Sequence, residues 1–229
     1  MDPLNTISDV KAWLETHKKV SQSLGFVPTM GALHEGHMDL VRRSIRENEH
    51  TLVSIFINPT QFSPNEDFKS YPRSIKEDIA LLKKSGVSAV FMPTEDTIYP
   101  NKDYLPTEIS TPELGSILCG VSRPNFFKGV CMVVLRLFNI VTPNKAYFGE
   151  KDYQQLFIIK KMVSDFFLPI QVKSVPTKRE SDGLAYSSRN LKLTKTDRAL
   201  APIIYQSMCE IQKSYLAGET RTTVLRDLA

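Results

Sequence analysis

The sequence predicts an α/β fold: a doubly wound parallel sheet with helices on both faces, followed by a smaller, mainly helical C-terminal domain. Two observations predict it. Apolar runs rich in β-branched residues, typical of strands buried on both faces, alternate with segments of helical periodicity up to residue 176. From residue 177 onward, a polar loop and helical periodicity follow without another strand. We therefore expect a first domain over 1–176 and a second over 177–229.

The first elements predict a helix and then a strand–helix–strand unit. Ser8 is a candidate N-cap for a helix that runs to His17, and 23–29 is an apolar run bounded like a buried strand. Apolar residues at helical spacing occupy 36–48, and a continuous β-branched run occupies 51–58. Strand, helix and strand in about 35 residues are typical of a βαβ unit.

The pattern then continues. Ser74 and Glu77 have the spacing of a capping box, which predicts a helix over 74–86, and the next strand is expected over 87–93. An apolar stripe over 130–141 predicts a helix of the core rather than a cofactor site.

The remaining elements complete the alternation. We expect a strand over 145–150, a helix over 153–166 and a strand over 170–177. A single helical pattern runs over 194–218, and the segment 220–229 begins a helix without a stop signal. The second domain therefore looks truncated. Alternation of this kind predicts a Rossmann-like sheet joined by right-handed crossovers.

Charge, cysteine spacing and hydropathy limit the classes of ligand and the location that we expect. With 29 basic and 25 acidic residues the formal net charge is only +4, and no run of basic residues is present, which favours small anions over nucleic acid as ligands. The cysteines Cys119, Cys131 and Cys209 form no C-x-x-C pair, which argues against a disulfide framework or zinc site, and we expect the first two to be buried. The sequence contains neither an apolar signal segment nor a spanning helix, so we expect a cytoplasmic protein without membrane contact.

The run PTMGALHEGH lies where a predicted strand gives way to a helix N-terminus. Unpaired N–H groups and the positive end of the helix dipole attract phosphate there. Gly31 and Gly36 allow close approach of a ligand, and His34 and His37 can donate hydrogen bonds to phosphate oxygens. Two alternatives remain open at this point: a surface loop with two solvated histidines, and a metal site that lacks its third ligand.

Other segments are ambiguous when taken alone. Residues 149–152 follow the fourth strand, near the point where a doubly wound sheet reverses direction and opens its crevice, but they also resemble an ordinary solvated helix start. Asn58-Pro59 is a plain turn signal, and Ser187-Ser188-Arg189 is typical of a flexible turn.

Taken together, these segments resemble a known family. His34-Glu35-Gly36-His37 is similar to the H-x-G-H signature of the nucleotidyltransferase superfamily. The longer run PTMGALHEGH, with VSIFINPTQF, FKSYPR, FGEKDYQQL and DGLAYSSRN in that order, resembles the pantoate–β-alanine ligases. This resemblance implies condensation of (R)-pantoate with β-alanine through a pantoyl adenylate, with ATP as substrate and Mg²⁺ as cofactor. It also implies a homodimer.

The resemblance assigns roles to individual residues. His34, His37 and Lys151 would act on the phosphates, with His37 a possible acid toward the leaving group. Gln61, Gln155, Asn58 and Tyr71 would lie at the pantoate and β-alanine sites, and no metal ligands are assigned. The residues implied for ATP are Met30, Gly31, Ala32, Leu33, His34, Glu35, Gly36, His37, Gly149, Glu150, Lys151, Asp152, Lys178, Tyr186, Ser187, Ser188 and Arg189.

Three positions depart from the family pattern. Phe126 stands where a histidine is expected beside pantoate, Lys128 replaces an arginine, and Tyr186 replaces an aliphatic residue or methionine. Two other hypotheses remain open: a different H-x-G-H adenylyltransferase, and a nucleotide-binding relative with weak catalysis, which Phe126 and the short C-terminal segment suggest.

Overall fold

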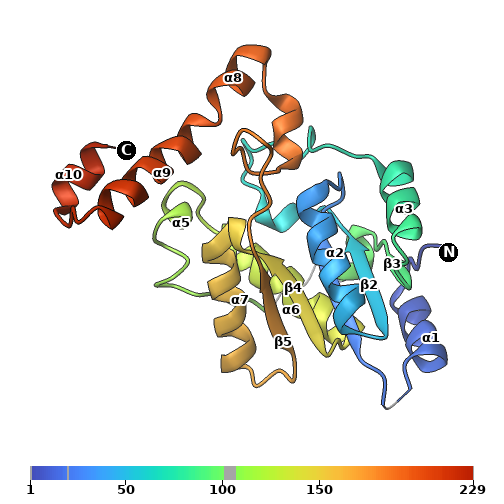
Figure 1. The fold of residues 1–229 in the computed structure, drawn as a ribbon. Helices are drawn as coiled ribbons and strands as arrows, with labels where there is room; N and C mark the ends of the chain where they lie inside the picture. Colours follow the sequence, from blue (N-terminus) through green and yellow to red (C-terminus); the bar gives the residue numbers. More distant parts are fainter. Residues whose placement is uncertain (1, 20, 101–106, 229) are drawn as a thin grey trace. The chain divides into compact units, whose positions relative to one another are not determined.

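The computed structural model describes residues 2–19, 21–100 and 107–228. The chain divides into two compact units, Met1–Pro176 and Thr177–Ala229. Within the described residues of the first unit, five parallel strands form one sheet in the order β3-β2-β1-β4-β5 (Figure 1). The strands are β1 (Leu24–Thr29), β2 (His50–Ile55), β3 (Ala89–Phe91), β4 (Lys145–Gly149) and β5 (Gln171–Val175). This arrangement confirms the predicted α/β class.

Helices cover both faces of this sheet because neighbouring strand residues point to opposite sides. Phe26 and Leu52 pack with α6 (Phe126–Val141), whereas Val27 and Val53 pack with α2 (Glu35–Glu47). The first face also carries α1 (Ile7–His17) and α7 (Tyr153–Asp165), and the second carries α3 (Ile75–Lys84). Two short helices, α4 (Glu95–Ile98) and α5 (Cys119–Ser122), lie in the connection to α6. The continuous apolar strands of the sequence are therefore buried on both faces.

The strand order places the switch point of the sheet between β1 and β4. From β1 the chain proceeds outward through β2 to β3, whereas β4 pairs with the other side of β1 and continues to β5. The connections that leave the carboxyl ends of β1 and β4 therefore run to opposite faces of the sheet, at the point where doubly wound sheets generally bind their ligands. Residues that follow β1 and β4 therefore lie at the same end of the sheet.

Three predictions about helix caps and helix extent were wrong. Helix α1 is capped by Thr6 rather than Ser8, because the Thr6 hydroxyl accepts from the Asp9 N–H and the Asp9 carboxylate accepts from the Thr6 N–H. The capping box of Ser74 and Glu77 does not form; the Ser74 hydroxyl donates to Asp78 instead, at 3.0 Å.

The third error concerns the helix expected over 194–218. It is two helices, α8 (Lys195–Leu200) and α9 (Ile203–Leu216), which are separated at Ala201 and Pro202. Proline lacks the N–H that a continuous helix would need at this point.

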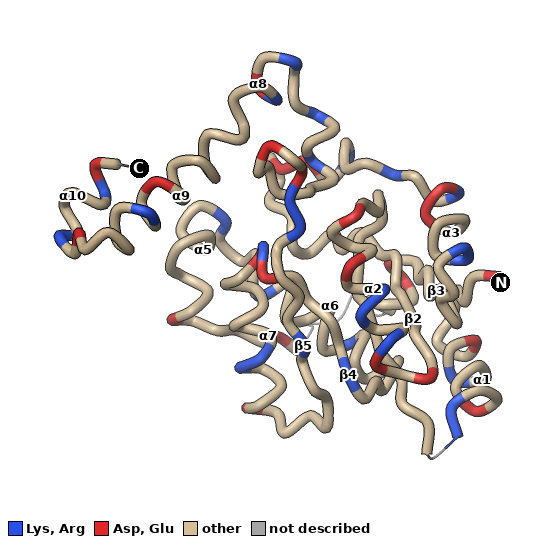
Figure 2. The backbone as a smooth tube through the Cα atoms, in the orientation of Figure 1, with Lys and Arg blue, Asp and Glu red and all other residues tan. Residues whose placement is uncertain are grey.

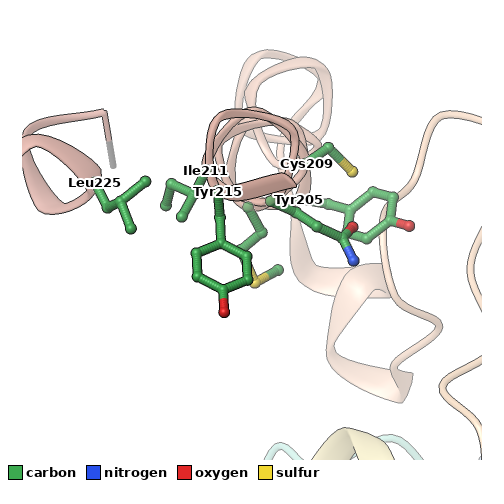
Figure 3. Close-up of a pocket in the computed structure, with 7 residues that line it drawn as sticks. Tyr205, Cys209, Ile211, Tyr215 and Leu225 are labelled. Carbon is green, nitrogen blue, oxygen red and sulfur yellow. The ribbon is translucent and has the colours of Figure 1, made fainter. Parts of the chain in front are cut away.

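The second unit is helical apart from the loop that begins it. Besides α8 and α9 it contains α10 (Thr222–Asp227), and Ala229, to which the predicted periodicity extends, lies outside the described residues. Side chains of α9 and α10 line an apolar pocket of about 470 Å³ (Figure 3). Its labelled lining residues are Tyr205, Cys209, Ile211, Tyr215 and Leu225. None of these lining residues was predicted from the sequence to bind a ligand.

The distribution of charge, the exposure of two cysteines and the hydropathy of the helices can be compared with the sequence-based expectations. Basic and acidic residues are interspersed along α1, α2 and α3, as Figure 2 shows, in keeping with the small net charge. Cys131 is buried as expected, but Cys119 is exposed at the start of α5, so that prediction was wrong. Among the helices that the structure describes, none combines the length and apolar character that crossing a bilayer requires.

Candidate active site

The loop after β1 leads directly into α2. Gly31 has φ +80° and Ala32 has φ +48°, a left-handed pair that turns the chain sharply at the end of the strand. The Thr29 hydroxyl accepts from the Gly31 N–H at 3.2 Å and donates to the Ser54 carbonyl of β2 at 2.7 Å. The loop therefore turns at the carboxyl end of β1, and His34 lies at the N-cap of α2.

His34 and His37 lie together at this helix N-terminus. Their ring centroids are 4.0 Å apart, and the backbone N–H of His34 donates to Nδ1 of His37 at 3.3 Å. Glu35, between them, turns away and forms an ion pair with Arg42 at 2.7 Å. The two imidazoles, and not the carboxylate, thus share the start of the helix with its unpaired N–H groups.

Lys151 and Asp152 reach the same place from β4. Both belong to a 3₁₀ turn, η2 (Glu150–Asp152), that follows Gly149 at the carboxyl end of the strand. The Lys151 ammonium lies 3.3 Å from an Asp152 carboxylate oxygen, and both side chains are exposed to solvent in part. The sequence placed this segment correctly after the fourth strand.

The electrostatics show that these groups form one cluster. Burial, and to a lesser extent the charges of His34 and Lys151, lower the pKa of His37 to about 3. The pKa of His34 is also lowered, first by burial and then by Lys151, while Asp152 acts in the opposite direction. Residues 34, 37, 151 and 152, predicted from two distant segments, are therefore brought together.

Gln61 lies on the other side of the β1 loop. It ends the turn η1 (Pro59–Gln61) after β2, is 9% exposed, and donates from Nε2 to the sulfur of Met30 at 3.1 Å. Gln61 therefore borders the first residue of the loop that carries the histidines.

Asn58 holds the side chain of Gln61 through a hydrogen bond. It is 1% exposed, and its amide donates to Gln61 Oε1 and to the Gly129 carbonyl, both at 3.1 Å. Its Oδ1 accepts from the hydroxyls of Tyr99, at 2.8 Å, and Thr60, at 2.9 Å. These hydrogen bonds engage the amide atoms of Asn58 and tie it to Gln61.

Two further predicted residues belong to this region. Tyr71 is 6% exposed and packs its ring edgewise against Phe62, with centroids 6.0 Å apart. Gln155 lies half-buried in the first turn of α7, directly after η2. Both are positioned by the segments that follow strands β2 and β4.

The second unit carries the remaining predicted residues on one hairpin. The Tyr186 N–H donates to the Lys178 carbonyl at 3.0 Å, so these two predicted residues are paired. The Ser187 hydroxyl caps η3 (Ser188–Lys192) by accepting from the Arg189 N–H at 3.2 Å. Ser188 is buried and Arg189 exposed. Ser187 and Arg189 are thus held on a defined turn.

Comparison with known proteins decides the family. A family model described as pantoate-beta-alanine ligase matches residues 2–228. The chain belongs to the pantoate–β-alanine ligase family. A pantothenate synthetase of Acetivibrio thermocellus is 46% identical over 226 residues, covering 99% of this chain and 80% of that protein.

Solved structures of the family agree with this fold. A pantothenate synthetase of Thermus thermophilus superposes with a TM-score of 0.92 at 42% identity, covering all of this chain and 80% of that one. A ligase of Francisella tularensis, described as a complex with β-γ ATP and β-alanine, has a TM-score of 0.84 at 43% identity and covers 90% and 78%.

Phe126 and Lys128, two of the residues that depart from the family pattern, each have a defined contact. The Phe126 ring lies under the Arg123 guanidinium, whose carbon is 3.6 Å from the ring centroid. Arg123 also forms a bidentate pair with Glu66, at 2.6 and 2.7 Å, and donates to the Gln61 carbonyl at 3.3 Å. Lys128 pairs with Glu108 at 2.6 Å. Phe126 therefore stabilises an arginine that supports the Gln61 turn.

Sequence reasoning missed two supporting residues. Arg123 received no role, although it contacts the backbone of Gln61. Asp78, which accepts hydrogen bonds from the loop after β1, was overlooked in favour of its neighbour Glu77. The alternation of buried and exposed positions in α3 could have indicated Asp78, since a carboxylate on the apolar face requires donors.

Proposed function

We propose that this chain condenses (R)-pantoate with β-alanine to give pantothenate, converting ATP to AMP and pyrophosphate. In the first step a carboxylate oxygen of pantoate attacks the α-phosphorus, and the bond to pyrophosphate breaks. In the second step the amine of β-alanine attacks the acyl carbon of the pantoyl adenylate, AMP leaves with the bridging oxygen, and the amine releases a proton.

The His34–His37–Lys151 cluster at the sheet switch point is the observation that carries this proposal. The first step brings together two anions, so the site must supply cationic charge and N–H donors. Lys151 supplies the charge, and the two imidazoles with the N-terminus of α2 supply the donors. Because the pKa of His37 is about 3, it acts at neutral pH as a neutral hydrogen-bond donor rather than as an acid.

Gln61 and Gln155 are proposed to bind pantoate, with Tyr71 close by. Gln61 borders Met30 at the ATP loop, which supports a pantoate position next to the nucleotide. Asn58 is assigned to hold Gln61, and Phe126 to hold Arg123. The departure at Phe126 is therefore compatible with pantoate binding.

The second unit is proposed to act as a small lid domain. Its Ser187, Ser188 and Arg189 would add donors to the triphosphate, and the backbone of Lys178 and Tyr186 would contact the nucleotide. Shielding matters because the mixed anhydride of the adenylate must be kept from water until the amine arrives.

Magnesium is proposed to arrive with ATP. No group of three His, Cys, Asp or Glu side chains within the described segments could hold a metal ion by itself. A Mg²⁺ ion bound mainly by phosphates and water needs only one or two carboxylates, and Asp152 fits that need. Bound there, the ion would neutralise phosphate charge. We also propose a cytoplasmic homodimer on the basis of the family resemblance.

A three-substrate assay tests the function. AMP, pyrophosphate and pantothenate should form in equal amounts only when ATP, pantoate and β-alanine are all present. ATP binding without AMP formation would indicate the nucleotide-binding relative, and AMP formation with a different acid would indicate another adenylyltransferase. Either result would overturn the proposal.

A further inference from the structure

A single buried carboxylate holds the loop between β1 and α2. Asp78 lies in the first turn of α3 and is 3% exposed. Its Oδ2 accepts from the Ala32 N–H at 2.8 Å, and its Oδ1 accepts from the Leu33 N–H at 2.9 Å. The Ser74 hydroxyl donates to Oδ1 at 3.0 Å. Two consecutive backbone amides, 45 residues or more away in sequence, are thus bound by one side chain.

The loop requires such support because its conformation is unfavourable. Ala32 has φ +48°, a region that residues with a Cβ rarely adopt. Gly31 has φ +80°, and a Cβ placed on it would lie 3.1 Å from Asp78 Oδ2 and from Ile55 Cγ2. The loop therefore lies closely against the carboxylate, in a shape that Ala32 would otherwise tend to leave.

The position of this loop sets the direction of the two histidines. Leu33 directly precedes His34, the N-cap of α2, and His37 follows in the first helical turn. A change in the loop would move both rings relative to Lys151, whose charge both imidazoles experience. Positioning errors of this kind reduce binding and catalysis strongly.

We propose that Asp78 is a positioning residue for ATP, acting through the 31–33 loop without touching the nucleotide. This inference rests on the proposed function of the histidine cluster. A carboxylate repels phosphate, and the two Asp78 oxygens already accept three hydrogen bonds in a buried place, so direct contact with either phosphate or metal is disfavoured.

The test compares Asp78→Asn with Glu77→Gln. The first change replaces one acceptor oxygen by an NH₂ group that faces a loop N–H, leaving a buried donor unsatisfied. The second removes the same charge from the exposed neighbour in the same helical turn. ATP affinity is measured by calorimetry, and hydrogen exchange is followed in the peptide that contains residues 30–37.

Asp78→Asn should weaken ATP binding about tenfold or more and accelerate exchange of the loop amides, while the KM for pantoate changes less than twofold. Glu77→Gln should match the parent. Ser74→Ala, which removes only the third hydrogen bond, should give a smaller change in the same direction and covers the case in which Asp78→Asn does not fold.

Three results would overturn the proposal. Asp78→Asn could bind ATP like the parent, it could lose stability while its folded fraction keeps full ATP affinity, or its main defect could be a raised requirement for Mg²⁺. The calorimetric and exchange measurements need no turnover. They therefore decide the role of Asp78 even if the parent forms no pantothenate, which would be a failure of the proposed function alone.

Discussion

The backbone N–H of His34 donates to Nδ1 of His37 across 3.3 Å. An acceptor Nδ1 leaves the proton of the neutral imidazole on Nε2, so the bond selects one tautomer. Because burial holds the pKa of His37 near 3, this neutral form is the one present at physiological pH. The helix N-terminus therefore presents an Nε2–H donor that is fixed in orientation by its own N-cap residue.

Acid should destabilise the fold through His37. Its pKa is about 3 in the fold against 6.5 for an ordinary histidine, so between these values only the unfolded chain binds the proton. The free energy of unfolding should therefore rise with pH across this window, with a slope of up to about 1.4 kcal/mol per pH unit from this group, and reach its full value above pH 6.5. Denaturant melts of the parent and of His37→Gln at several pH values measure this slope. A slope that survives the substitution unchanged would contradict the assigned pKa.

Removing the phosphate donors should abolish most activity. His37→Ala and Lys151→Ala are each expected to lower the rate of adenylate formation on the order of 10²-fold, because a donor aimed at developing charge contributes about 3 kcal/mol. Pyrophosphate release in single-turnover experiments measures this step. Lys160→Ala, which removes an exposed charge from α7, serves as the control and should retain the parent rate. Variants within a few-fold of the parent would show that these side chains do not contact the phosphates.

Asn58 should matter more for stability than its neighbours. Asn58→Ala leaves the buried Gly129 carbonyl and Gln61 Oε1 without their donor, so we expect a loss of about 2 kcal/mol in the free energy of unfolding and a raised KM for pantoate. Tyr99→Phe removes one of the bonds to Asn58 and should cost about 1 kcal/mol. Urea melts and pantoate kinetics provide the comparison. Equal effects of the two substitutions would argue against Asn58 as the centre of this network.

Arg123 should affect pantoate but not ATP. Lysine cannot reproduce the bidentate pair with Glu66 while also reaching the Gln61 carbonyl, so Arg123→Lys should raise the KM for pantoate several-fold. The matched control is Arg46→Lys at an exposed position of α2. If the KM for ATP rose instead, the arginine would have to support the nucleotide loop rather than the Gln61 turn.

The sequence predicts the sheet well because strands that are buried on both faces form nearly continuous apolar runs. Strand β2 is buried from Thr51 to Ile55, and the largely apolar, β-branched run that this burial favours is visible without a structure. The meeting of His34 with Lys151 also follows from topology, since the carboxyl ends of adjacent parallel strands share one edge.

Side chains that act through others are harder to predict. Asp78 and Glu77 are adjacent carboxylates at a helix start, and only the packing of α3 shows which one faces the loop. The hydrogen bond from the Asn58 amide to the carbonyl of Gly129, which lies in α6 and 71 residues later in the chain, was not predicted either. Such contacts depend on tertiary geometry that local spacing does not contain.

Isotope transfer from pantoate to AMP tests the central claim most directly. If a pantoate oxygen attacks the α-phosphorus and remains on AMP when the amine displaces it, pantoate labelled with ¹⁸O in its carboxylate should yield AMP that carries one ¹⁸O atom. Mass spectrometry of AMP formed in the complete reaction gives the answer. Unlabelled AMP formed together with pantothenate would contradict activation of the acid as an adenylate at this site.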